Sequence, residues 1–360
     1  MKLKLMHFNE LRHFIQRLLD WSHWPHYLFY FPLMIPWLAY YVRSRSLWFF
    51  TPSNPTLAFG GFEGEGKRQM YDQLPAEYCP KSLFIKPFMS LGQVLTKLEV
   101  AGFTYPFIVK PDVGMKGILF RKIENELQLR QYHIQMPADY IIQEFLDLPL
   151  EVSVFYCRKP FEKHGKITAL IQKNLLEVCG DGVTNLSDLI LQQPIASRWV
   201  KKSSINLDRQ LGIVLKKGER YCLSHVANLF HGAQFKDLKH LIDDQLTELF
   251  DRISRQNHFY YGRYDIKCNS VEEMKEGQNF YILEFNGAGS VPNHIYAGKY
   301  SLLSAYREIL THWRWLYDIS QYNHENGFPR WSLKKGHYFL KNSKKHFKVL
   351  KKLDKELILS

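Results

Sequence analysis

Two neighbouring segments decide the fold of this chain: Tyr260-Tyr-Gly-Arg-Tyr-Asp-Ile-Lys267 and Asn279-Phe-Tyr-Ile-Leu-Glu-Phe-Asn-Gly-Ala-Gly-Ser290. Both are rich in aromatic and β-branched residues, and a polar, turn-like segment ending at Gly277 lies between them. This pattern predicts two antiparallel strands joined by a loop.

The first strand is expected to separate polar from apolar side chains. Successive side chains on a strand point to opposite faces, which places Arg263, Asp265 and Lys267 together on one face. Tyr264 and Ile266 then occupy the other face. One side of this strand is therefore predicted to be charged and the other to join the core.

The second strand follows the same alternation. Glu284 and Asn286 share a face, and the residues expected to point into the core are Tyr281, Leu283 and Phe285. If the polar faces of the two strands coincide, two carboxylates and an amide oxygen converge beside an arginine and a lysine. Such hard oxygen ligands suit Mg2+ held against substrate phosphates. The alternative is a solvated hairpin face whose charges pair weakly.

The residues of these two strands resemble a motif of a known protein family. Gly262-Arg-Tyr-Asp265 followed by Leu283-Glu-Phe-Asn-Gly287 resembles the metal-binding strand pair of the ATP-grasp superfamily, as in D-alanine:D-alanine ligases and glutamate-adding ligases. In that family the aspartate, glutamate and asparagine hold two Mg2+ ions on ATP, and the arginine contacts the transferring phosphoryl group. The resemblance implies these metal roles for Asp265, Glu284 and Asn286, with Mn2+ as a substitute ion, and the phosphoryl contact for Arg263.

The composition excludes several classes of protein. The chain has 360 residues, 46% of them hydrophobic and 15% aromatic, which favours a folded globular protein over disorder. Its five cysteines are scattered and odd in number, so they indicate buried thiols in a reducing compartment instead of a zinc site or a disulfide framework. No secretory signal is expected, because the apolar run begins only near Tyr27.

The net charge of +13 is concentrated at the two ends. Residues 1–50 carry six Lys or Arg against two acids, and residues 331–360 carry nine Lys against two acids. Basic ends on a nearly neutral body predict an anionic surface partner. Nucleic acid would explain the lysines of the tail, but it does not explain the apolar N-terminal arm, so an anionic membrane is the favoured partner.

The N-terminal arm, residues 1–50, combines two apolar patterns. Residues 3–19 have apolar side chains at helical spacing. Tyr27–Val42 has no Asp, Glu, Lys or Arg and is interrupted by Pro32 and Pro36. Because a spanning helix needs about 20 apolar residues, this segment is too short to cross a membrane. Two alternatives stay open: an interfacial or re-entrant anchor, and a hydrophobic arm packed on the protein's own core.

A glycine-rich segment, Gly60-Gly-Phe-Glu-Gly-Glu-Gly-Lys-Arg68, opens the body of the chain. It fits a phosphate-binding Walker A loop poorly, because Arg68 stands where a Ser or Thr would bind Mg2+. It also resembles the Gly-Gly-x-x-x-Glu element of D-alanine:D-alanine ligases, in which a glutamate meets the ammonium of the substrate. Glu63 or Glu65 would take that role. A plain glycine turn that exposes the acids is the third alternative.

A lysine at the end of an apolar strand marks a second candidate element. Lys110 ends the run Tyr105–Val109, and a loop with two glycines three residues apart follows it. Such a loop can offer backbone N–H groups to phosphate oxygens while the lysine supplies a point charge. The segment resembles the ATP-grasp lysine strand and its mobile phosphate-covering loop, which implies nucleotide contacts for Lys110, Asp112, Gly114, Lys116 and Gly117.

Tyr140–Leu146 and Pro149–Val154 predict two strands with a brief linker. In ATP-grasp ligases this is the hinge between lobes, where backbone groups bond the adenine edge and a glutamate takes the ribose hydroxyls. The linker here has one extra residue, so the register is open by one position. The nucleotide-binding residues implied here are Gln143, Glu144, Phe145, Leu146 and Glu151. The alternative for the two glutamates is an edge-strand charge facing water.

Smaller signals complete the chain. Lys173 is interpreted as a surface lysine, with a phosphate contact as the alternative. Cys179–Thr184 predicts a tight turn that opens a capped helix, and residues 234–256 and 300–317 predict amphipathic helices. Gly287 and His294 are candidate substrate contacts, with a core role as the alternative for His294. The tail to Leu357 predicts a basic amphipathic helix.

Together these features predict an α+β ATP-grasp fold whose two lobes, each with an antiparallel sheet, enclose ATP. The expected parts are an arm (1–50), a small α/β pre-domain (51–104), a central lobe (105–160), a C-terminal lobe with the metal site (161–320) and a basic tail (321–360). The resemblance implies an ATP- and Mg2+-dependent ligase that joins a small-molecule carboxylate to an amine through an acylphosphate. The alternatives are a phosphotransferase and a catalytically idle docking module. The expected location is cytoplasmic, on the inner face of the membrane, and a homodimer is compatible with the sequence.

Overall fold

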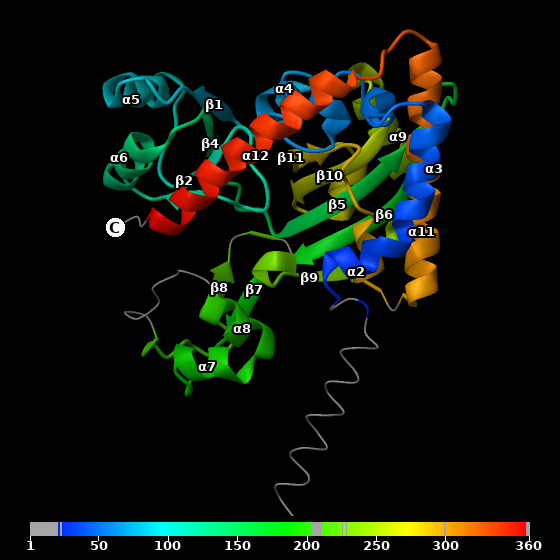
Figure 1. The fold of residues 1–360 in the computed structure, drawn as a ribbon. Helices are drawn as coiled ribbons and strands as arrows, with labels where there is room; N and C mark the ends of the chain where they lie inside the picture. Colours follow the sequence, from blue (N-terminus) through cyan, green and yellow to red (C-terminus); the bar gives the residue numbers. More distant parts are fainter. Residues whose placement is uncertain are drawn as a thin grey trace, which may run out of the picture.

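The computed structural model describes residues 21, 24–202, 211–224, 226–227, 229–298 and 300–357. They form two antiparallel sheets with helices around them, a small two-stranded sheet, and a long C-terminal helix (Figure 1). The predicted α+β class with antiparallel sheets is therefore confirmed. The amphipathic segment expected at residues 3–19 lies outside the described residues.

The first sheet has four antiparallel strands in the order β1-β4-β2-β3, with bounds β1 Ser82–Ile85, β2 Phe107–Pro111, β3 Arg121–Ile123 and β4 Tyr140–Glu144. Helices α5 (Leu91–Val100) and α6 (Glu126–Gln135) pack on one face and build a core with it. Ser90 caps α5 in a capping box with Gln93. Alternation along β2 and β4 turns Lys110 and Gln143 to the other face.

The second sheet has five antiparallel strands in the order β11-β10-β5-β6-β9, with bounds β5 Leu150–Cys157, β6 Lys166–Asn174, β9 Gln234–Asp237, β10 Tyr261–Cys268 and β11 Phe280–Asn286. Helix α9 (Asp244–Asn257) buries its apolar side against one face. Helix α11 (Leu302–Glu325) covers part of the other face, around Phe155 and Tyr261. The rest of that second face carries Glu151, Ser153, Arg263 and Asp265.

The small third sheet pairs β7 (Leu176–Cys179) with β8 (Arg220–Ser224), beside α7 (Leu186–Gln192) and α8 (Pro194–Lys202). The predicted turn and helix cap are confirmed here. The carboxylate of Asp181 accepts from the backbone N–H groups of Val183 and Thr184 at 2.8 and 2.7 Å, and Asn185 caps α7.

The N-terminal arm packs on α11 through one of its faces. The described part of the arm contains α2 (His26–Tyr30), η2 (Phe31–Leu33) and α3 (Met34–Ser44). Pro32 lies in η2, where the helix is interrupted, but α3 continues through Pro36, so the interruption expected at the second proline is absent from α3. Trp37 meets Trp313 at 4.8 Å between ring centroids, and Tyr40 stacks on Tyr317 at 4.6 Å. On this inner face the arm packs against the core of the protein. Over the described residues, no helix is long and apolar enough to span a bilayer.

Helix α12 (Leu333–Glu356) begins beside the arm and crosses to the first sheet (Figure 1). Leu350 of this helix and Leu357, which follows it, are buried in the core that α5 and α6 form with the first sheet. The predicted basic helix is present, and its nine lysines are exposed. The remaining short helices are η3 Thr51–Ser53, η4 Ala58–Gly61, α4 Lys67–Tyr71, η5 Ala76–Tyr78, η6 Leu229–His231, η7 Lys239–Leu241, α10 Val271–Lys275 and η8 Asn293–Tyr296.

Several expectations differ from the structure. Residues 234–241, expected to be helical, form β9 and η7, and the connection between β10 and β11 contains the short helix α10. Strand β1, which we assigned to a pre-domain, pairs with β4 of the first sheet. A bulge places Leu283 outside the β10–β11 register, so Phe280 and Ile282 are buried while Tyr281 and Leu283 are only partly covered. The prediction that Tyr281 and Leu283 point into the core was wrong for this reason.

Candidate functional site

The polar faces of β10 and β11 coincide, as the sequence predicted. Asp265 lies directly opposite Glu284 in the antiparallel ladder, and Arg263 lies opposite Asn286. The bulge at Leu283 follows immediately, and it leaves the Leu283 carbonyl to accept a 2.7 Å hydrogen bond from the hydroxyl of Tyr71 on α4. Bulges next to functional sites re-aim side chains in this way.

Asp265 is the centre of a dense network of cations and donors. Arg263 donates to both of its carboxylate oxygens, at 3.0 and 3.1 Å, and the ammonium of Lys173 lies 3.0 Å away. The hydroxyl of Ser153 also donates to it, and the amide of Asn286 lies at 3.5 Å. Burial alone would raise the pKa of Asp265, but the adjacent Arg263 and Lys173 hold that pKa below its usual value.

Lys173 links this network to Glu151. Its ammonium lies 3.4 Å from the Glu151 carboxylate, and only 5% of its side chain is exposed. The interpretation of Lys173 as a surface lysine was wrong, because β6 is an inner strand and turns this side chain towards β5 and β10. Burial raises the pKa of Glu151 in spite of Lys173. Glu151 is likewise not an edge-strand charge facing water, since β5 lies inside the sheet.

Glu284 pairs with a residue that the sequence analysis did not assign to the site. The ammonium of Lys67, at the first position of α4, lies 3.5 Å from its carboxylate. The only sequence signal for Lys67 was its place at the end of the glycine-rich segment. Glu65, two residues earlier, has a buried carboxylate oxygen with no hydrogen-bond partner among the described groups. Burial, and then the nearby Glu284, raise the pKa of Glu65 to about 7.

Lys110 approaches the same site from the first sheet. It is buried, and its ammonium donates to the side-chain oxygen of Gln143 at 2.9 Å. Gln143 in turn donates to the hydroxyl of Tyr71 at 3.0 Å, so α4 connects the two sheets. Burial, followed by repulsion from Lys67, lowers the pKa of Lys110 to about 7.

The glycine-rich segment packs directly on the end of β11. The N–H groups of Ala288 and Gly289 donate to the carbonyls of Gly60 and Gly61, at 3.0 and 3.2 Å. A Cβ at Gly287 would lie 2.5 Å from the Gly60 carbonyl oxygen, so this contact requires glycine. The structure thus brings the segment with Glu63 and Glu65 beside Asn286, and Glu63 is half-buried there.

The loop after Lys110 lies on the rim of the site and is anchored at several points. The Asp112 carboxylate accepts from the backbone N–H of Arg68 at 2.8 Å and so caps the first turn of α4. The carbonyl of Lys116 lies 3.1 Å from Nε2 of His231, and a Cβ at Gly117 would clash with Val226. Gly114, earlier in the same loop, has no such constraint, because a Cβ there would lie no closer than 3.5 Å to Pro111.

The predicted hinge is the link between the two sheets. The backbone N–H of Glu144 donates to the carbonyl of Lys81 at 3.0 Å, and its carboxylate accepts from the Lys81 N–H at 2.7 Å. Both groups therefore hold β1 in place. Phe145 lies under the ammonium of Lys122 at 4.9 Å, and Leu146 is half-buried. Nucleotide contacts of these residues stay a prediction.

His294 belongs to the core behind the site. Its Nε2 lies 3.1 Å from the carboxylate of Glu308 on α11, and the ring of His312 is 5.8 Å away between centroids. His312 in turn bonds the hydroxyl of Thr168 on β6 at 2.9 Å. Of the two interpretations of His294, the core role is the one that this geometry supports.

The side chains at the ladder fit a magnesium site by their donor chemistry. Two carboxylates and an amide oxygen are ligands that Mg2+ prefers, and directly opposed like charges call for a cation between them. No cluster of three or more His, Cys, Asp or Glu side chains suited to a metal occurs among the described residues. A magnesium ion held by two carboxylates and one amide oxygen would have positions of its octahedral shell left for substrate oxygens. The expected number of two ions stays a prediction.

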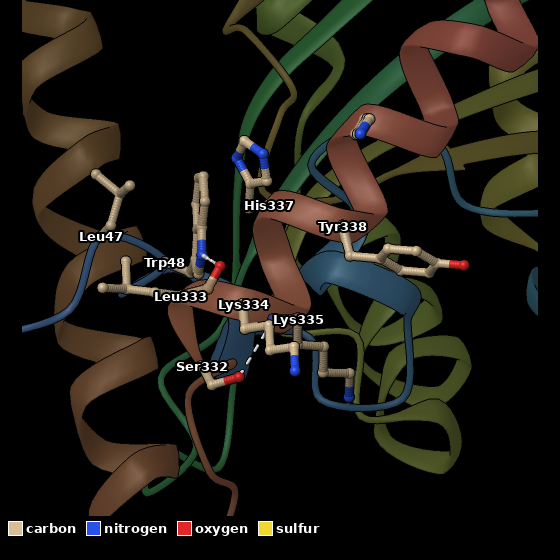
Figure 2. A pocket seen from close by; sticks show the side chains of 9 residues that line it. Leu47, Trp48, Ser332, Leu333, Lys334, Lys335, His337 and Tyr338 are labelled. Carbon is tan, nitrogen blue, oxygen red and sulfur yellow. Dashed lines mark hydrogen bonds between the residues drawn. The ribbon is translucent and has the colours of Figure 1, made fainter.

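A surface hollow of about 830 Å3 lies elsewhere, between Leu47 and Trp48 and the start of α12 (Figure 2). Lys334, Lys335 and Lys341 line it, and Trp48 donates to the carbonyl of Leu333 at 3.4 Å. Its lining residues include no carboxylate and none of the candidate catalytic, nucleotide-binding or metal-binding residues. We therefore place the chemistry at the Asp265 site.

No protein-family model matches this chain, and no curated protein matches it. Among solved structures, it is similar to a bifunctional glutathione synthetase from Pasteurella multocida, at 15% identity and a TM-score of 0.37 over 68% of this chain and 35% of that one. It is also similar to the VanG D-Ala:D-Ser ligase from Enterococcus faecalis, at 13% identity and a TM-score of 0.40 over 72% of this chain and 62% of that one.

A D-alanine–D-alanine ligase from Bacillus anthracis is similar at 14% identity and a TM-score of 0.38, over 72% of this chain and 67% of that one. By their names, two of these three proteins are ligases and the third is a glutathione synthetase. The chain spans about a third of the glutathione synthetase and less than two thirds of the VanG ligase. Because all three TM-scores are below 0.5, we base the functional assignment on the geometry of this chain.

Proposed function

We propose that this protein is an ATP- and Mg2+-dependent ligase that joins a carboxylate to an amine. One observation carries the proposal: the opposed carboxylates of Asp265 and Glu284, with Asn286 beside them, face a site that Lys110 enters from the other sheet. Oxygen ligands on one side and a buried ammonium on the other suit a polyphosphate with its metal ion. The family resemblance of the same residues supports this choice.

In the proposed reaction, a substrate carboxylate oxygen attacks the γ-phosphorus of ATP, and the bond to the β–γ bridging oxygen breaks to release ADP. The amine then attacks the carbonyl carbon of the acylphosphate, phosphate leaves, and the amine loses a proton. Asp265, Glu284 and Asn286 would hold Mg2+, which neutralises charge on the phosphates. Lys110 and Arg263 would stabilise the charge that develops on the transferring phosphoryl group.

The substrate side is proposed to recognise an amino group. Glu65 offers a buried carboxylate oxygen without a partner among the described groups, close to Glu284 and Lys67. An ammonium placed there would favour the ionised carboxylate and lower its raised pKa. This supports Glu65 over Glu63 as the residue that meets an amino-acid or peptide-like substrate.

Product and phosphate assays separate the proposed activity from its alternatives. The protein is incubated with ATP, Mg2+ and pooled amino acids, and phosphate release is measured with and without the amines and carboxylates. Phosphate release that requires both an amine and a carboxylate supports the ligase. A stable phosphorylated product without amine dependence supports a phosphotransferase, and absence of turnover with every pool supports an idle docking module.

We also propose that the enzyme works in the cytoplasm on the inner face of a membrane. The arm turns one side to α11 but leaves Tyr27, Phe31 and Ile35 on its outer side 73, 76 and 75% exposed. Further exposed apolar residues on the arm are Leu28, Met34, Leu38 and Val42. An apolar helix face inserts into the headgroup boundary, and each nearby lysine adds about 1 kcal/mol on an anionic leaflet.

Flotation with vesicles of anionic phospholipid tests the location. Phe31→Ser with Ile35→Ser should remove the protein from the vesicle fraction, because both changes lie on the outer face of the arm. Phe88→Ser is the matched control, since Phe88 is 83% exposed on the first-sheet lobe. Wild-type protein that stays at the bottom of the gradient at low salt would rule the location out, and self-association would then point to a homodimer through this face.

A further inference from the structure

Helix α12 contacts both ends of the loop that follows Lys110. Nε2 of His346 lies 2.8 Å from the carbonyl oxygen of Val113, where the loop begins. At the far end, the Asp354 carboxylate accepts from the backbone N–H of Leu119 at 2.8 Å and pairs with Arg121 at 3.0 Å. Figure 1 shows α12 crossing from the arm to the first sheet.

The same helix also contacts the glycine-rich segment. A Cβ at Gly64 would lie 2.8 Å from the hydroxyl of Ser343 and 3.3 Å from the ring of Phe339. One helix therefore touches the segment that carries Glu63 and Glu65 and the loop that carries Lys116 and Gly117. The first of these elements packs on the end of β11 in the second sheet, and the other follows β2 of the first sheet.

Leu119 has a backbone conformation that needs such support. Its φ is +55°, in the left-handed region that residues with a Cβ seldom occupy. Its N–H is held by Asp354, its carbonyl accepts from the hydroxyl of Tyr132 at 3.0 Å, and its side chain is fully buried. Strained positions persist where surrounding contacts fix them. The Asp354 contact is thus part of what defines the loop's conformation.

We propose that α12 is a strap that sets the nucleotide-covering loop in its binding conformation, with Asp354 as the positioning residue. This inference rests on the proposed function, because it assigns the loop to ATP. Asp354 does not reach the reacting groups; it acts through Leu119 and Arg121. Its loss should therefore weaken the binding of ATP with Mg2+ and leave the Asp265 network intact.

The test compares Asp354→Asn with Glu356→Gln. Both variants remove one negative charge from the end of α12, but the Glu356 carboxylate is exposed and its ion pair is with Lys352, at 3.9 Å, on the same helix. Two readouts are used: the dissociation constant of ATP with Mg2+ by calorimetry, and the rate of trypsin cleavage after the exposed Lys116 in the loop. The second readout does not depend on nucleotide. His346→Ala serves as a second variant at the other end of the loop.

If α12 acts as a strap, Asp354→Asn should bind ATP roughly tenfold more weakly, which corresponds to about 1.4 kcal/mol of binding free energy. Trypsin should also cleave this variant after Lys116 at least severalfold faster than the wild type. His346→Ala should change both readouts in the same direction, and Glu356→Gln should match the wild type. Unchanged binding and cleavage in both Asp354→Asn and His346→Ala would overturn the strap while wild-type ATP binding stands. Wild-type protein that binds no ATP would instead overturn the proposed function, and with it the assignment of this loop to a nucleotide.

Discussion

Asp265 and Glu284 face each other directly across the β10–β11 ladder, although like charges in this position repel. Cations from three elements offset this repulsion: Arg263 of the same strand, Lys173 of β6 and Lys67 of α4. The pKa of Asp265 is held below its usual value by Arg263 and Lys173. Repulsion between two opposed carboxylates destabilises a hairpin, and a hairpin with a purely structural role does not require it. The same two carboxylates can bind a divalent cation.

Lys173 should be essential for stability. Lys173→Met leaves the buried carboxylates of Glu151 and Asp265 without their shared cation, and breaking a buried ion pair costs roughly 3–5 kcal/mol. Urea denaturation at neutral pH measures the loss. Lys236→Met, at an exposed position on β9 of the same sheet, is the matched control and should change stability by less than about 0.5 kcal/mol. A Lys173→Met variant as stable as the wild type would contradict the network.

Glu65 should make stability depend on pH. Its pKa is raised to about 7 in the folded protein, against about 4.3 in an unfolded chain. Between these values the folded protein binds more protons, so Glu65 reduces stability as pH rises through this window. Glu65→Gln should therefore gain stability relative to the wild type, by roughly 1–3 kcal/mol, between about pH 4.5 and pH 8. If the stability difference between Glu65→Gln and the wild type does not change with pH over this range, the pKa of Glu65 is not raised by burial.

Lys110 should take up a proton when ATP binds. Its pKa is lowered to about 7 by burial and by Lys67, with Glu284 and Glu151 acting in the opposite direction. Phosphate oxygens favour the ammonium form, so binding at about pH 8 should consume up to one proton, and binding at about pH 6 much less. Calorimetry in buffers of different ionisation enthalpy measures this uptake. Lys110→Met should bind more weakly and show no uptake; equal uptake at both pH values would exclude Lys110 as its source.

The sequence predicted the ladder well because strand periodicity and residue chemistry are local. The shared polar face of Arg263, Asp265, Glu284 and Asn286 followed from alternation along each strand. The bulge at Leu283 was not predictable in this way, because alternation assumes an unbroken register; the carbonyl of Leu283 instead accepts from Tyr71, a residue distant in the chain. One inserted position was enough to move Ile282 into the core in place of its neighbours.

The residues that the sequence missed, or in the case of Lys173 placed on the surface, act over long separations in the chain. No sequence pattern distinguishes Lys67 or Lys173 from other lysines. Lys67 reaches Glu284 because α4 packs beside β11, and Lys173 reaches Asp265 because β6 is an inner strand. Asp354 looked like one acid in a basic tail, yet it fixes Leu119 across the fold. Long-range packing of this kind leaves no periodic signal in the sequence. The sequence therefore predicted the ladder residues of the candidate site, and the structure added the residues that pack against them.

The most direct test of the account measures binding of ATP, with and without Mg2+, by calorimetry. Wild-type protein is compared with Asp265→Asn, Glu284→Gln and the exposed control Asp72→Asn, after thermal unfolding has established which variants are folded. We predict Mg2+-dependent binding by the wild type and the control, and a loss of at least roughly tenfold, about 1.4 kcal/mol, in each ladder variant. Folded Asp265→Asn and Glu284→Gln proteins that bind ATP with Mg2+ as tightly as the wild type would contradict the claim that this ladder is the nucleotide and metal site.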